Sequence, residues 1–105
     1  MIKHIVSWTL ADHAEGADKA TNAALLASEL AALADCVPGI LAFEVVLPQP
    51  GLEAGFDMML YSEFADTAAL QAYIEYPPHK QFGARMAKMR TERRAFDYDT
   101  AALPK

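Results

Sequence analysis

The residues best suited to chemistry are Tyr73 and His79, which flank a double proline at positions 77 and 78. A residue that precedes a proline is pushed out of the helical region, so a helix that carries Tyr73 must end near Tyr76. The turn that follows can bring the imidazole of His79 back beside the phenol of Tyr73. Such a pair could bind a carbonyl compound, because a histidine can remove a proton at neutral pH and a tyrosine can donate a hydrogen bond to the developing oxyanion.

Each of these side chains also has a purely structural interpretation. His79 could cap the helix that follows the prolines, and Tyr73 falls on an ordinary buried helical stripe. His4 could be a core histidine with satisfied hydrogen bonds, and His13 falls in a polar loop where we expect it at the surface. The residue types alone therefore leave both a binding site and a packed core open.

Hydrophobic periodicity predicts the elements that position these residues. In chain order they are a strand at 2–10, a helix at 18–35, strands at 40–47 and 56–64, a helix from Asp66 to Tyr76, a helical segment around Phe82, Met86 and Met89, and a strand at 93–99. The turn-rich residues 48–55 predict a hairpin between the two middle strands. We expect Asn22 on the polar side of the first helix, and Leu41 on the same side of its strand as Phe43 and Val45.

This order predicts an α+β fold of the ferredoxin-like βαββαβ type, with an antiparallel four-stranded sheet and helices on one face. The face toward the helices should carry an apolar pocket closed by Tyr73 and His79. Its expected ligand-binding residues are His4, Val6, Trp8, Met58, Leu60 and Phe82.

The other face of the sheet should include Ile5, Met59 and Tyr61, which are too apolar to be left in water. A second copy of the chain is the simplest cover for such a face. The expected partners are therefore a homodimer mate and a small-molecule ligand.

Composition narrows the function classes. The 105 residues predict a single domain spanning 1–105, and the net charge of −5 disfavours nucleic acid and anionic membranes as partners. No apolar run approaches the ~20 residues of a membrane span, and the single cysteine, Cys36, favours a reducing cytoplasmic location. Glycine-rich phosphate loops and metal-ligand spacings are missing from the sequence, so we expect no cofactor and no metal.

Several short motifs together resemble the stress-responsive dimeric α/β-barrel (Dabb) domain family. They are the opening Met1-Ile2-Lys3-His4-Ile5-Val6, the segment Tyr61-Ser62-Glu63-Phe64 leading into Ala69-Leu70-Gln71-Ala72-Tyr73, the Pro78-His79 pair, and the closing Phe96-Asp97-Tyr98. The resemblance spans almost the whole chain. It implies two ferredoxin-like subunits packed sheet to sheet into a barrel.

Within that family the chain is similar to plant polyketide cyclases of the olivetolic acid cyclase type, which close poly-β-ketones by an aldol reaction. The resemblance implies that His79 is the base and Tyr73 the oxyanion stabiliser, and it matches His4 to a histidine of the cyclase pocket. The chain departs from the cyclases at Met58, where they have a second strand histidine, and in its first helix. These departures predict a different substrate.

Three hypotheses of different classes follow. The first is a small-molecule-binding homodimer for a carbonyl or aromatic polyketide-like compound, with cofactor-free aldol cyclase or lyase activity. The second is a cofactor-independent monooxygenase, and the third is a stress-response structural or interaction protein without catalysis. The convergence of Tyr73, His79 and His4 in space would favour the first.

Overall fold

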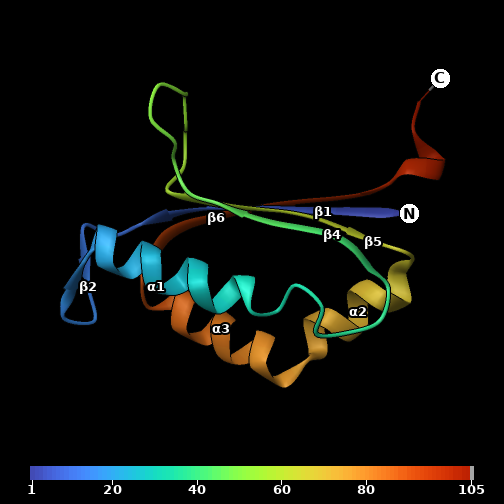
Figure 1. Ribbon diagram of the computed structural model, residues 1–105, viewed down its shortest axis with the longest axis horizontal. Coiled ribbons are helices and arrows are strands. Elements are labelled where there is room, and N and C mark those ends of the chain that lie inside the picture. The colour runs from blue at the N-terminus through green and yellow to red at the C-terminus, as the bar shows by residue number, and fades with distance from the viewer. Residues whose placement is uncertain (105) are drawn as a thin grey trace.

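A computed structural model describes residues 1–104 and places the helices on one face of a single large sheet (Figure 1). The elements are β1 (Ile2–Leu10), β2 (His13–Ala14), β3 (Ala17–Asp18), α1 (Lys19–Ala31), β4 (Ile40–Val46), β5 (Met58–Phe64), α2 (Thr67–Glu75), α3 (Pro77–Ala87), β6 (Arg90–Asp99) and the 3₁₀ turn η1 (Thr100–Ala102). The four-stranded sheet has the order β4-β5-β1-β6 and is antiparallel throughout. The prediction of a ferredoxin-like fold is confirmed.

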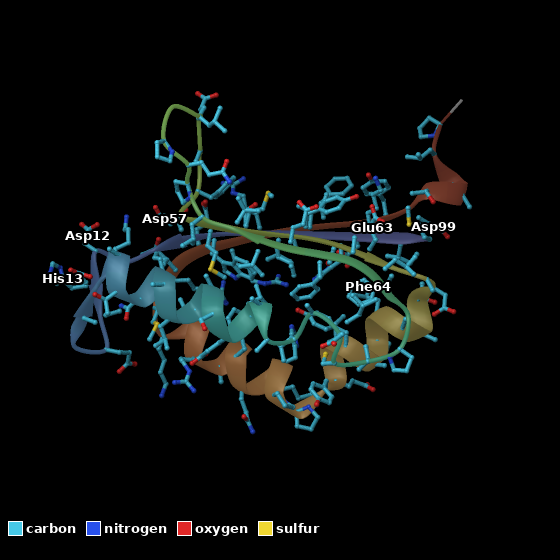
Figure 2. The ribbon with its side chains drawn as sticks, in the orientation of Figure 1. Asp12, His13, Asp57, Glu63, Phe64 and Asp99 are labelled. Atoms are coloured by element: carbon cyan, nitrogen blue, oxygen red, sulfur yellow. The ribbon has the colours of Figure 1, made fainter. Side chains whose placement is uncertain are left out.

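Strict alternation along β1 separates the two faces of the sheet. His4, Val6 and Trp8 are buried beneath the helices, whereas Lys3, Ile5 and Ser7 on the other face are only half-buried. The same alternation continues in β5, where Phe64 points to the helix layer and Glu63 to the opposite side (Figure 2). The core therefore lies on one side of the sheet, between the strands and α1, α2 and α3.

The predicted boundary at the double proline is confirmed. Helix α2 ends at Glu75, and Tyr76 leaves the helical region with ψ of 124°. Helix α3 then starts directly at Pro77, where a proline is tolerated because the first amides of a helix have no intrahelical partner. The prolines thus break one helix and begin the next without an intervening loop.

The first helix differs from the prediction in length and in facing. It ends at Ala31 rather than at residue 35, and the chain continues in turns. Asn22, expected on the polar side, is buried, because its side-chain amide donates to the carbonyl of Ala14 at 3.0 Å and to that of Ala17 at 3.4 Å. These carbonyls belong to the small β2–β3 hairpin, which the periodicity did not predict.

Two strand predictions were also wrong in detail. Leu41 does not share a face with Phe43, because a register shift between Ile40 and Ala42 adds a residue to β4 and leaves Leu41 exposed. The last strand begins at Arg90, not at residue 93, since it pairs with β1 as far as Leu10. The predicted hairpin between β4 and β5 is present, and its loop rises from the face without helices (Figure 1).

Within residues 1–104, no helix is both long and apolar enough to cross a membrane. Helix α1, the longest, has 13 residues.

Candidate functional site

The double-proline turn places the rings of Tyr73 and His79 side by side. Their centroids lie 4.4 Å apart with the planes tilted by 51°. Tyr73 sits in the last turn of α2, and His79 is the third residue of α3, so the break between the helices sets this contact. The sequence predicted that the two rings could meet, and they do.

Tyr73 is fully buried among aromatic rings. Its ring centroid lies 5.3 Å from that of Phe64, 5.8 Å from that of Phe43 and 6.2 Å from that of His4. Its hydroxyl is buried and has no hydrogen-bond partner among the described residues. Burial raises the pKa of this phenol well above its ordinary value, and the nearby Cys36 acts in the same direction. The hydroxyl therefore stays protonated and can act as a hydrogen-bond donor.

His79 is half-buried at the start of α3, with its Nδ1 3.2 Å from the carbonyl oxygen of Ile74. A carbonyl can only accept, so Nδ1 carries the proton and Nε2 keeps its lone pair. Burial lowers the pKa of His79, and the nearness of His4 and Arg93 acts in the same direction, although the hydrogen bond to the carbonyl of Ile74 raises it. The imidazole is thus neutral near pH 7 and its Nε2 can accept a proton.

The third candidate, His4, is held by a carboxylate that sequence reasoning did not assign to the site. Its Nδ1 lies 2.5 Å from Oδ1 of Asp97, which sits opposite it in the β1–β6 register. His4 is buried, whereas the side chain of Asp97 is 44% exposed. The signal in the sequence was the alternation of the last strand, but which residue meets His4 depends on the register.

The helix layer stops short of the edge strand β6. Arg93, Ala95 and Asp97 pair with Trp8, Val6 and His4, so they share the face toward the helices, yet all three are exposed. His4 therefore lies at the border between a closed core and a face of β6 that solvent reaches. A molecule could approach Tyr73, His4 and His79 from this side.

The other residues expected to bind a ligand are packed in the core. This holds for Val6, Trp8, Met58, Leu60 and Phe82, which are at most 5% exposed. Trp8 and Phe82 meet edge to face with centroids 6.1 Å apart. These side chains fill the space between the sheet and the helices in which we expected a pocket. Their role in ligand binding therefore stays a prediction.

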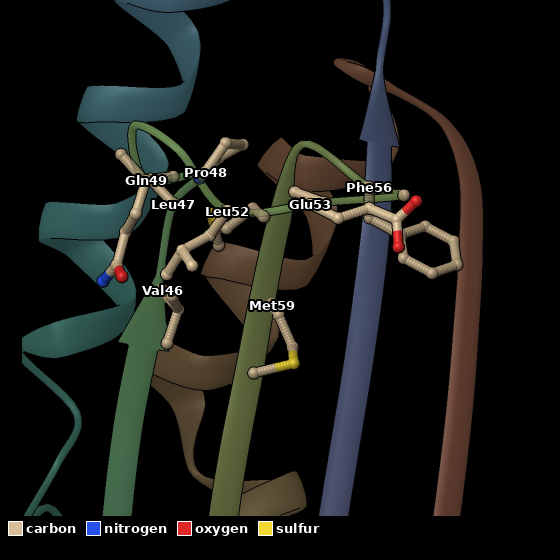
Figure 3. A pocket seen from close by; sticks show the side chains of 11 residues that line it. Val46, Leu47, Pro48, Gln49, Leu52, Glu53, Phe56 and Met59 are labelled. Atoms are coloured by element: carbon tan, nitrogen blue, oxygen red, sulfur yellow. The ribbon is translucent and has the colours of Figure 1, made fainter.

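A hollow of about 310 Å³ lies instead on the opposite face, beneath the β4–β5 loop. In Figure 3, Val46 and Met59 form its floor from neighbouring strands and Leu52 from the loop lies over it, while the ring of Phe56 extends to one side, beyond β1. Of the six predicted ligand-binding residues only Met58 also lines this hollow. Its lining is mostly apolar, and among the described residues that form it Glu53 alone is ionisable.

The remaining titratable residues of the chain do not form a metal site in the part that the structure describes. No group of three or more His, Cys, Asp or Glu side chains there is arranged to hold an ion. His13 lies exposed on β2, at the far end of the molecule from Phe64 (Figure 2).

Comparison with known proteins gives matches to one family and to solved structures. The family model described as "Stress responsive A/B Barrel Domain" matches residues 2–100. No curated protein matches the chain.

Three solved structures illustrate the range of similarity. A dimeric protein of unknown function with a ferredoxin-like fold from Bacteroides fragilis is 28% identical, with 93% of this chain and 94% of that chain covered and a TM-score of 0.77. A Dabb family protein with a ferredoxin-like fold from Mesorhizobium loti is 26% identical over 93% and 94%, with a TM-score of 0.66. A hydroxynitrile lyase from Passiflora edulis is 16% identical over 98% and 96%, with a TM-score of 0.74, and at that identity it supports the fold alone.

Proposed function

The chain belongs to the stress-responsive A/B barrel domain family, and from this premise we propose that it is a homodimer that binds a small carbonyl or aromatic polyketide-like compound at Tyr73, His79 and His4. We further propose that it acts on this compound as a cofactor-free aldol cyclase or lyase. The homodimer is supported by the Bacteroides fragilis structure, which is described as dimeric. The fold of the Passiflora edulis enzyme indicates that this architecture can carry a lyase.

The observation that carries the proposal is the buried hydroxyl of Tyr73, which has no hydrogen-bond partner within residues 1–104. Leaving a buried polar group unsatisfied costs about 1–3 kcal/mol, so folded proteins usually avoid it. Phenylalanine would fill the same aromatic cluster without this cost. A ligand oxygen that accepts from the hydroxyl would supply the missing partner and would explain why a tyrosine stands here.

The protonation states of the two rings suit complementary roles. Tyr73, with its raised pKa, donates a hydrogen bond to a ligand carbonyl and stabilises the enolate oxygen that forms. His79, neutral through its lowered pKa, takes a proton from the carbon next to that carbonyl. The enolate carbon then attacks a second carbonyl, a carbon–carbon bond forms, and the new alkoxide regains the proton from His79.

His4 completes the group as a second imidazole whose orientation is fixed. Because the carboxylate of Asp97 accepts from Nδ1, the other ring nitrogen of His4 is left free to accept a hydrogen bond from a ligand. The proposed entrance lies over β6, where Ala95 and Asp97 are exposed beside it. Binding requires the Tyr73 cluster to open toward this side.

Ligand binding can be tested by a thermal-shift screen of the wild type against small phenols and β-ketones. A ligand of the folded state raises the Tm by mass action. Compounds that stabilise the wild type should lose their effect in Tyr73→Phe and His79→Gln. Tyr61→Phe is the matched control, since its hydroxyl lies on the opposite face and donates to Glu63.

Tyr73→Phe has a second expected outcome in the absence of ligand. Because the substitution removes an unsatisfied hydroxyl, the free energy of unfolding should stay the same or rise by up to about 1 kcal/mol, measured by urea denaturation. A variant that is as stable as the wild type but no longer responds to ligand identifies a binding hydroxyl. A clear loss of stability would show that the hydroxyl is satisfied within the folded chain and would remove the main support for the proposal.

One observation favours a second function class. The core packing of Val6, Trp8, Leu60 and Phe82 fits a structural or interaction protein without catalysis. If no compound of the screen stabilises the wild type and cellular function survives both Tyr73→Phe and His79→Gln, this second class is correct.

A further inference from the structure

The open face of the sheet carries a large exposed aromatic ring on one edge. Phe96 of β6 is 69% exposed and meets Tyr98 edge to face, with centroids 6.2 Å apart. Phe96 pairs with Ile5, so it points away from the helices. Arg94, two residues earlier on the same face, is likewise exposed and bonds Glu92 at 3.1 Å.

The opposite edge of the same face carries the hollow beneath the β4–β5 loop. Val46 and Met59 form its floor, and Leu52, which lies over it, is 68% exposed. Glu53 adds a carboxylate to its lining, and Glu44 is exposed further along β4. One edge of the face therefore offers an apolar ring beside a cation, and the other offers an apolar hollow beside two carboxylates.

We propose that this hollow is the docking site for Phe96 of a second copy of the chain, with Arg94 of the partner subunit facing Glu53. The inference rests on the homodimer of the proposed function and names its anchor. In a two-fold dimer the contact occurs twice, because each copy presents both the ring and the hollow.

Symmetry brings these two edges together. When two identical sheets pack face to face about a two-fold axis parallel to the strands, the edge strand β4 of one copy lies over the edge strand β6 of the other. Levels along the strands are preserved by this rotation. Met59 is level with Arg94 because both pair with Ser7, and Tyr61 is level with Phe96 because both pair with Ile5.

The ring therefore lies within two residues of the level of the hollow, which is about 7 Å along a strand. Aligned sheets pack with their strands turned by about 30°, which changes the relative level of two facing edge strands by about 4 Å. The loop between β4 and β5 rises from the open face, so it can reach around the partner's β6 edge (Figure 1).

The charges on the two edges are complementary. The guanidinium of Arg94 has five N–H donors, so it can keep its bond to Glu92 and still bind a carboxylate of another copy. Opposite charges at the rim of an interface favour the correct pairing of the two surfaces. The same arrangement disfavours stacking β4 on β4, which would place Glu44 and Glu53 against their own copies.

Cross-linking between two singly substituted chains tests the contact. Leu52→Cys and Phe96→Cys, each made in a Cys36→Ser background, are mixed, oxidised and analysed by non-reducing electrophoresis and mass spectrometry. We expect a disulfide that joins one chain of each kind. Leu25→Cys replaces Leu52→Cys in the control, because Leu25 is exposed on α1, on the helix side of the sheet.

The oligomeric state separates the failure of this inference from the failure of the homodimer. We expect light scattering to give a dimer for the wild type and at least a tenfold larger dissociation constant for Phe96→Asp, with Leu25→Asp unchanged. A dimeric wild type with no 52–96 disulfide above the control overturns the docking site and leaves the homodimer standing. A monomeric wild type overturns both.

Discussion

The two faces of the sheet carry similarly apolar residues, but the side chains are buried on one face and partly exposed on the other. On the helix side, His4, Val6 and Phe64 are buried among α1, α2 and α3. On the other side, Ile5 is half-buried and Phe96 is mostly exposed, although their side chains are as apolar as those of Val6 and Phe64. The difference does not come from composition. It comes from where the helices of this chain can reach, so the open face needs a cover that the chain itself does not provide.

Each face of the sheet also lacks a different kind of contact. On the helix side, the hydroxyl of Tyr73 lies inside an apolar cluster and finds no hydrogen-bond partner in the described part of the chain. The open side leaves apolar surface without cover, at Phe96 and in the hollow beneath the β4–β5 loop. The unpaired hydroxyl would be satisfied by a small polar ligand, and the uncovered apolar surface would be buried by another protein surface.

We expect the largest loss of stability from a substitution of Phe64, which is fully buried. Phe64→Ala removes a core ring that contacts Tyr73 and His4, so it should lower the free energy of unfolding by about 3–5 kcal/mol. Urea denaturation at several protein concentrations measures this. The loss should be the same at every concentration.

Phe96→Ala is the matched variant on the open face. An exposed side chain contributes within about 0.5 kcal/mol to the stability of the isolated subunit, so any larger loss should depend on protein concentration. If Phe96→Ala were as costly as Phe64→Ala and independent of concentration, the two faces would not differ in the way described above.

The next largest loss of stability is expected at one of two glycines that have a left-handed backbone conformation. Gly39, with φ of +92°, lies under the start of α2, where an added Cβ would come within 2.8 Å of the Cβ of Ala69. Gly51, with φ of +80°, lies in the β4–β5 loop and has nothing within 4 Å. An alanine at either site adopts a conformation that costs about 1–2 kcal/mol, and at Gly39 the helix must also move, at about 1–3 kcal/mol more.

We therefore expect Gly39→Ala to destabilise the chain by about 2–5 kcal/mol and Gly51→Ala by about 1–2 kcal/mol. Thermal and urea denaturation of the two variants measure the difference. Equal losses would mean that α2 can move away from residue 39 at little cost, and that the helix layer is less tightly fixed than its packing suggests.

The sequence predicted those parts of the fold that depend on local pattern. Alternation in residues 2–10 defined both faces of β1, and the double proline placed the break between α2 and α3. From that break followed the contact between Tyr73 and His79. Strict alternation and a proline act within a few residues, so they can be interpreted without knowing the rest of the fold.

The errors arose where distant segments decide the outcome. Asn22 is buried because carbonyls of the β2–β3 hairpin accept its amide, and Leu41 is exposed because of a bulge in β4. Asp97 reaches His4 through the β1–β6 register, across 93 positions of sequence. Whether the side chains between sheet and helices leave space or fill it depends on volumes from several elements, which periodicity does not measure.

The smallest expected effect concerns His79, whose imidazole is half-buried at the edge of the candidate site. Its pKa in the folded chain is below its ordinary value of 6.5, chiefly through burial, so the unfolded chain binds more protons as the pH falls through 6.5. The wild type should therefore lose stability between pH 7 and pH 5.5, and His79→Gln should lose less. We expect a difference of a few degrees in Tm, measured by thermal denaturation across that range.

His13→Gln is the matched control, because His13 is exposed on β2. If His79→Gln and the wild type lose stability in parallel, the imidazole is as well solvated in the folded chain as in the unfolded one, and it belongs with the open surface rather than with the covered core around Tyr73.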